Sequence, residues 1–173
     1  MKALSTANNL QLSWSQPSAL ERHFELHSDN ILLGNLHFET ASTAHGTLLT
    51  PGSAAECWTF KGTRFSLKPR VTIRKDGTND DLAVYRPKFW DGGWVEFVNG
   101  PRFHWKSTSF WGTEWGFSNT QEELLFVLKP KLFDLLKVQS AVEIGTKWHD
   151  LDELPLLLML GWYLKVRDSY DTR

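Results

Sequence analysis

The chain has 173 residues, of which 41% are hydrophobic and 23% are charged, and its formal net charge is −1. This length suffices for one domain with a full core, and the composition is typical of a globular protein. The near-zero charge excludes a global field that would attract nucleic acid or an acidic membrane. We expect a single domain over residues 1–173, with residues 1–9 frayed.

The distribution of charge and the cysteine content indicate where a partner would bind and in which compartment the protein acts. Lysine and arginine outnumber acids only in residues 61–106, so an anionic partner is expected to bind there. The single cysteine, Cys57, excludes an internal disulfide and favours a reducing compartment. The N-terminal residues lack the apolar segment of a signal peptide, which predicts a cytoplasmic protein.

Most of the chain is predicted to form short β-strands separated by turns rich in Gly, Asn, Asp and Pro. The predicted strands are 10–14, 23–27, 31–38, 47–50, 55–60, 65–75, 82–90, 94–98, 102–106, 110–117 and 123–128. Residues 40–46 are predicted to be a loop. Residues 132–144 are ambiguous, because their first part has a helical pattern and 138–144 alternate. Some ten to twelve short strands at this spacing indicate a sandwich or a barrel.

The last predicted element is a helix over about 152–167. Residues 154–164 are apolar without a break; acids precede them and bases follow. Asp152 is a candidate N-cap, and Pro155 falls in the first turn, where a missing N–H costs nothing. A helix that is apolar on all sides is buried on all sides. At about 20 Å it is too short for a membrane span, which needs about 20 apolar residues.

An all-β chain that ends in such a helix has few ways to bury it. A closed antiparallel barrel of about 10–12 strands, with the helix through its centre, satisfies both elements. The alternative is an open sandwich with the helix over one end. Gly161 would cost the helix about 1 kcal/mol relative to alanine, and the close approach of a strand or a large ring would offset this cost.

The predicted strand count and the stretch Glu-Leu-Pro-Leu-Leu-Leu-Met-Leu-Gly-Trp-Tyr-Leu at 153–164 resemble the tubby C-terminal-like fold. Tubby proteins, LURP-one-related proteins and phospholipid scramblases share this fold. The resemblance implies a barrel threaded by a C-terminal hydrophobic helix. Roles in the superfamily range from phosphoinositide binding to proposed lipid scrambling. No residue-level motif is shared, so no functional residue is carried over.

The most suggestive chemical feature is a set of cations on predicted strands. Strand alternation places each group on one face, and pairing as a meander would bring the groups onto one outer surface together with His104. We call these seven residues the basic stripe: Lys68, Arg70, Arg74, Arg86, Lys88, Arg102 and Lys106. Phosphates or lipid headgroups would fit such a surface. The alternative is that these are the solvated faces of three strands, with acids from elsewhere balancing them.

Other candidates have simpler explanations. A group of tryptophans either stacks on a ligand or fills the barrel, and filling is favoured: Trp90, Trp94, Trp105, Trp111 and Trp115. His23 and His27 would lie about 13 Å apart along a strand, too far to share a metal ion. His149 and Asp150 are expected to cap the helix rather than to form an acid/base pair. The sequence predicts no catalytic residue, metal site or cofactor.

Three functions remain, in this order. The first is a non-enzymatic, tubby-like module that binds an anionic lipid or phosphate-bearing ligand through the basic stripe, with peripheral membrane contact and without nucleic acid. The second is a lipocalin-like carrier of a small apolar ligand. The third is an enzyme with its site at the barrel mouth.

Overall fold

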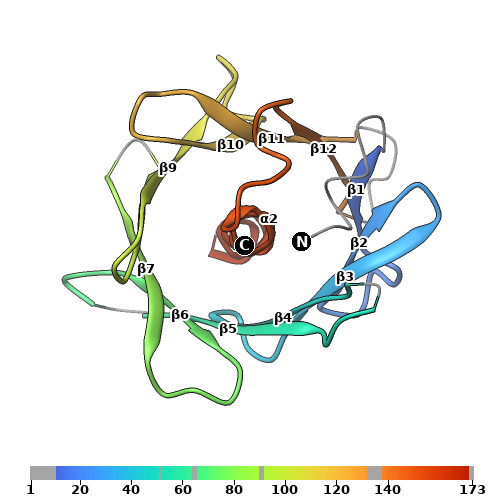
Figure 1. Ribbon diagram of the computed structural model, residues 1–173, viewed down its shortest axis with the longest axis horizontal. Helices are drawn as coiled ribbons and strands as arrows, with labels where there is room; N and C mark the ends of the chain where they lie inside the picture. Colours follow the sequence, from blue (N-terminus) through green and yellow to red (C-terminus); the bar gives the residue numbers. More distant parts are fainter. Residues whose placement is uncertain (1–10, 51, 64–65, 90–91, 132–137, 172–173) are drawn as a thin grey trace.

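The computed structural model describes residues 11–50, 52–63, 66–89, 92–131 and 138–171. Within these residues, twelve antiparallel strands close into a barrel that surrounds one helix (Figure 1). The strands are β1 (Leu12–Ser15), β2 (His23–Ser28), β3 (Ile31–Phe38), β4 (Thr43–Leu48), β5 (Glu56–Gly62), β6 (Val71–Lys75), β7 (Asp81–Pro87), β8 (Gly93–Phe97), β9 (Arg102–Ser107), β10 (Trp115–Ser118), β11 (Leu124–Pro130) and β12 (Ser140–Ile144). The predicted closed barrel is confirmed.

Each strand pairs with its neighbours in the chain, and β1 pairs with β12 to close the ring. Closure leaves no strand edge open for pairing with another chain. Inward and outward residues alternate as the strand period requires. On β2, for example, Phe24 and Leu26 are buried inside while His23, Glu25 and His27 lie on the outer face.

The helix α2 (Leu154–Asp171) lies at the centre of the ring (Figure 1). Every residue from Leu154 to Leu164 is buried, as predicted for a helix that is apolar on all sides. The helix begins two residues later than predicted and extends to Asp171 rather than 167. Asp152 lies in the preceding turn, and Pro155 occupies the first helical turn, as predicted.

Aromatic rings from the barrel wall hold the helix in register. Trp162 stacks on Trp14 of β1 with ring centroids 5.4 Å apart and planes 2° from parallel. Tyr163 stacks on both Phe38 and Phe60, at 5.5 and 5.4 Å. Such pairs contribute beyond the area they bury, by about 0.5–1.5 kcal/mol each. The Tyr163 hydroxyl donates to the carbonyl oxygen of Ser42 at 2.6 Å.

Two rings of the barrel wall approach the helix closely at Gly161. A Cβ atom built there would lie 3.0 Å from Cζ3 of Trp105 and 3.3 Å from Cζ of Phe126. The close approach of large rings expected from the sequence is therefore present. Trp105, 1% exposed, fills the barrel as predicted.

The predicted boundaries differ from the structure most at three strands. Strand β6 begins at Val71 instead of 65, and residues 66–70 are an exposed loop. Strand β10 begins at Trp115 instead of 110, and residues 108–114 form a loop. Strand β4 occupies Thr43–Leu48, mostly where a loop was predicted. In the first two cases apolar residues alternate without being buried. The ambiguous residues 132–137 and Trp90 lie outside the described residues.

The barrel has two open ends, and α2 runs from one to the other. We call the end where α2 finishes the C-terminal mouth. It is bordered by the loops that follow β1, β3, β5, β7, β9 and β11. Two contacts place the helix end there: Tyr163 with Ser42 of the β3–β4 loop, and Lys165 Nζ with the Thr113 carbonyl of the β9–β10 loop at 3.5 Å.

Candidate functional site

Four of the seven cations in the basic stripe lie against carboxylates. Arg74 Nε donates to Asp81 Oδ1 at 2.7 Å, and Arg86 Nη1 donates to Glu96 Oε2 at 2.9 Å. Arg102 Nη2 lies 3.8 Å from the other oxygen of Glu96. These pairs are solvent-exposed, so each contributes at most about 1 kcal/mol to stability. Their main consequence is that this part of the outer wall carries little net positive charge.

Trp94 is the centre of this part of the wall. Its ring stacks on His104 with centroids 4.6 Å apart and planes 4° from parallel, because Trp94 and His104 face each other across β8 and β9. The Arg102 guanidinium carbon lies 4.3 Å from the Trp94 ring centre and Lys88 Nζ lies 5.7 Å from it. Both cations are within cation–π range. Trp94 therefore makes outer-wall contacts rather than filling the barrel.

The fourth pair joins Lys106 to Glu122 of the β10–β11 turn. The hydrogen bond from Lys106 lowers the pKa of Glu122, and the charges of Lys106, His104 and Lys88 add to this effect. His104 Nδ1 lies 3.9 Å from Glu122 Oε1. The pKa of Glu122 is low because several positively charged groups lie near its carboxylate.

We expect Lys106→Met to raise the pKa of Glu122 toward its ordinary value, because the largest cause of the depression is removed. Since the pKa is lower in the folded state, the contact stabilises the fold above the ordinary carboxyl range, and this contribution is lost as pH falls through the folded pKa. An NMR pH titration of the Glu122 side-chain carbonyl measures the shift. Glu123, whose pKa is lowered by Lys147 and Asn119, provides an internal control that should not move.

The other three cations of the basic stripe lie at the C-terminal mouth. Lys68 and Arg70 are exposed on the β5–β6 loop, and Lys88 directly follows β7. None of the three makes an ion pair with any carboxylate in the described part of the chain. The basic stripe is thus divided: a neutralised part on the wall, and a set of cations available to a ligand at the mouth.

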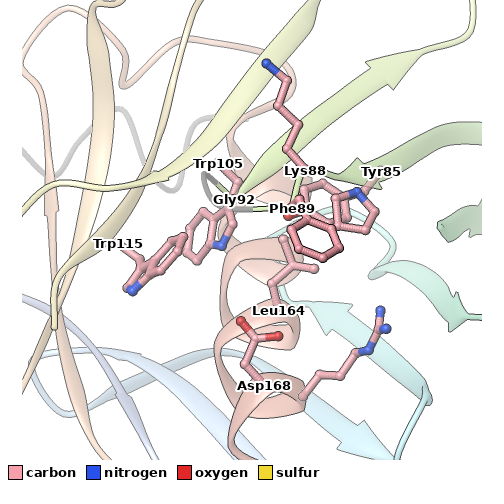
Figure 2. Close-up of a pocket in the computed structure, with 10 residues that line it drawn as sticks. Tyr85, Lys88, Phe89, Gly92, Trp105, Trp115, Leu164 and Asp168 are labelled. Atoms are coloured by element: carbon pink, nitrogen blue, oxygen red, sulfur yellow. The ribbon is translucent and has the colours of Figure 1, made fainter. Parts of the chain in front are cut away.

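A pocket of about 340 Å³ opens at this mouth between the end of α2 and the wall (Figure 2). Trp105 and Trp115 lie on one side of it, and Tyr85 and Phe89 on the other. Leu164 and Asp168 project from the helix, and the Lys88 side chain extends away from the helix. Pro87, Gly92 and Arg167 complete the lining. The pocket therefore combines aromatic walls with two cations and one carboxylate.

The pKa shifts of Tyr85 and Lys165 show that this region is enclosed. Burial raises the pKa of the Tyr85 hydroxyl well above its ordinary value; the nearby Asp168 carboxylate raises it further and Arg167 opposes the shift. Burial lowers the pKa of Lys165, and Asp168 partly restores it. Tyr85 is consequently a neutral phenol at physiological pH, a donor or acceptor rather than a base.

The C-terminal mouth also carries apolar side chains that the sequence patterns assigned to strands. Leu67 is fully exposed, and Phe89, Phe110 and Trp111 are 92%, 93% and 82% exposed. The alternation around Leu67 and the aromatic run 110–117 suggested buried strand faces, so these four residues were missed as surface features. Trp115 is half-buried beside the pocket.

Histidines and Cys57 do not form a further site. Glu25 lies between His23 and His27, 3.5 and 3.4 Å from their Nε2 atoms. Cys57 Sγ lies 3.7 Å from the Thr47 hydroxyl and is a free thiol. Within the described ranges, no group of three or more His, Cys, Asp or Glu side chains is placed to hold a metal ion. No helix among the described residues has the length and apolar character needed to cross a bilayer.

A comparison with protein-family models, with curated proteins and with solved structures gives no significant match to this chain. The evidence for its relationships is therefore architectural. A closed antiparallel barrel of twelve strands with one C-terminal helix fits the tubby-like barrel architecture.

Proposed function

We propose that this chain is a non-enzymatic binding module of the tubby-like superfamily that binds an anionic, phosphate-bearing group at its C-terminal mouth. One observation carries the proposal: Lys68, Arg70 and Lys88, the cations of the basic stripe without a described carboxylate partner, all lie at this mouth. Phosphate groups are recognised by such charges. The free thiol of Cys57 agrees with action in the reducing cytoplasm.

The position of α2 favours this proposal over a lipocalin-like carrier. A carrier holds its apolar ligand in the barrel interior. Here that space contains α2, and the residues of the helix that face the wall are buried against aromatic side chains. A ligand can therefore reach only the ends and the outer surface of the barrel. Binding at the mouth uses such a surface without displacing the helix.

The proposal is tested with the double variant Lys68→Glu/Lys88→Glu. Each lysine near an anionic surface contributes about 1 kcal/mol, so loss of the two positive charges alone weakens binding about thirtyfold, and their reversal to glutamate should weaken it further. Binding is measured by cosedimentation with phosphatidylcholine vesicles that contain phosphatidylserine, and by calorimetry with a soluble inositol phosphate. Both affinities should fall.

Lys75→Glu is the matched control. Lys75 is exposed at the end of β6, next to the β6–β7 turn at the opposite mouth, and makes no ion pair with a described residue. It lies farther from the C-terminal mouth than the screening length of about 8 Å in physiological salt. The control should bind as the unmodified protein does. The control reverses one charge and the double variant reverses two, so a control that loses half of the double variant's binding free energy or more would mean that total charge, and not the mouth, determines binding.

A further inference from the structure

Three neighbouring hairpin loops carry the exposed apolar side chains of the C-terminal mouth. They connect β5 to β6, β7 to β8 and β9 to β10, which are consecutive around the barrel. Leu67 lies on the first, Phe89 on the second, and Phe110 with Trp111 on the third. We call these four side chains the apolar tips. The pocket opens beside the second of these loops, since Phe89 is part of its lining.

The apolar tips are exceptional for this molecule. Among the described residues, every large hydrophobic side chain that is more than four-fifths exposed lies at the C-terminal mouth; Leu20, on the β1–β2 loop, joins the four tips there. At the opposite mouth the most exposed ones are Ile31 and Val98, at 64% and 58%. The gathering of such side chains at one mouth, and not the exposure of any single one, indicates a surface that becomes buried in a complex.

The β9–β10 loop holds its tips in a defined arrangement. The Ser109 hydroxyl accepts hydrogen bonds from the backbone N–H groups of Thr113 and Glu114, at 3.1 and 3.0 Å. The rings of Phe110 and Trp111 meet edge to face, with centroids 5.2 Å apart and planes at 87°. Because the loop is already ordered, little conformational entropy is lost when its tips enter another medium.

Cations neighbour the apolar tips along the chain or in space. Lys68 follows Leu67 in the chain, Lys88 precedes Phe89, and Lys165 of α2 contacts the β9–β10 loop. Two described carboxylates lie at this part of the mouth, Glu114 and Asp168, and among the described residues they are outnumbered by Lys68, Arg70, Lys88, Lys165 and Arg167. Aromatic and aliphatic residues at the tip with lysines at the base match the layers of an anionic bilayer, in which acyl chains lie below charged headgroups.

We infer that the apolar tips insert into the interfacial region of an anionic lipid bilayer, so that the pocket faces the headgroups. This inference rests on the proposed function and specifies the source of its phosphate-bearing group as a membrane lipid. Four tips distributed over three separate loops do not form the single continuous apolar patch on which a protein partner packs. Fluid lipid chains can surround each tip separately, so insertion does not require a continuous patch.

Insertion is measured directly with vesicles of phosphatidylcholine and phosphatidylserine whose acyl chains carry bromine, which quenches nearby tryptophans. The measurement uses a Trp90→Phe background, because Trp90 is next to Phe89 and lies outside the described residues. The other described tryptophans are buried or half-buried, so Trp111 should account for most of the quenching there. The variant Trp111→Phe keeps an apolar ring and should still bind, but it should lose most of the quenching. Binding with the same quenching in both proteins would show that this tip stays out of the bilayer.

Affinity supplies the second readout. Phe89→Ser and Trp111→Ser should each weaken vesicle binding about tenfold, the effect of leaving one large side chain out of an apolar medium. Trp111→Ser, whose position is outside the pocket lining, should not alter the affinity for a soluble inositol phosphate. Ile31→Ser, which removes an exposed apolar side chain at the opposite mouth, is the matched control and should bind vesicles normally.

The outcomes separate the two ideas. If the serine variants bind vesicles normally while Lys68→Glu/Lys88→Glu still weakens binding, then the attraction to vesicles is purely electrostatic and insertion is refuted. If the lysine variant has no effect on either probe, the proposed function itself fails. If Ile31→Ser weakens binding as much as Phe89→Ser, the apolar effect does not belong to the C-terminal mouth. The mutated tips are exposed, so unchanged thermal unfolding verifies that each variant is folded.

Discussion

Replacing Trp162 with alanine should lower the free energy of unfolding by about 4 kcal/mol, within the range for large aromatic residues in protein cores. Trp162 is 1% exposed; it stacks on Trp14 and meets Phe24 edge to face at 5.7 Å. The barrel wall is hydrogen-bonded all the way around, so it cannot collapse into the space the indole leaves. Urea unfolding followed by circular dichroism measures the change.

The matched control is Trp111→Ala, which removes the same side chain from a position that is 82% exposed. Its effect should stay within about 0.5 kcal/mol, as for most surface substitutions. A similar loss in both variants would contradict the central position of the helix, because only Trp162 is enclosed by the barrel.

Replacing Gly161 with leucine should destabilise the fold by about 3 kcal/mol, the upper part of the usual range for overpacking. The first added carbon already meets Trp105 at 3.0 Å and Phe126 at 3.3 Å, and leucine adds three more. Better helix propensity offsets only about 1 kcal/mol of this cost. Thermal and urea unfolding of the two proteins give the difference.

A double-mutant cycle identifies the cause of this loss. In a Trp105→Ala background the ring that obstructs residue 161 is gone, so Gly161→Leu should cost much less than in the unmodified protein. Equal costs in the two backgrounds would mean that the glycine is required for another reason, such as the backbone path of α2.

Much of the fold was predictable because two sequence patterns have direct structural causes. Alternation with a period of two places one face of each strand inward, and strands such as β2 and β9 lie where this pattern predicts. The unbroken apolar run at 154–164 requires an environment that is apolar on all sides, which a closed barrel supplies. Together these constraints favour a barrel around the helix over an open sandwich.

The patterns failed where apolar residues alternate without a core to face. The residues around Leu67 and the aromatic run at 110–117 have the period of strands, but their side chains lie on exposed loops. Periodicity reports which residues share a face and not whether anything covers that face. The apolar tips were therefore assigned to strands.

The candidate site shows a similar limit. Lys68 and Arg70 lie on a loop rather than on the predicted strand, and Arg74 follows a register shift in β6. Glu122, which pairs with Lys106, comes from a turn sixteen residues farther along the chain. Which cations are neutralised depends on the register between strands, and single-strand patterns carry no information about it.

The central position of α2 also determines when the domain is able to fold during synthesis. The ribosome makes all twelve strands before it makes the segment they enclose. Until Leu154–Asp171 has emerged, the growing chain holds aromatic side chains such as Trp14, Phe38 and Phe60 with nothing to pack against. The incomplete barrel then exposes the kind of apolar surface that chaperones bind. Completion of the last helix converts this open precursor into the native domain in one late step.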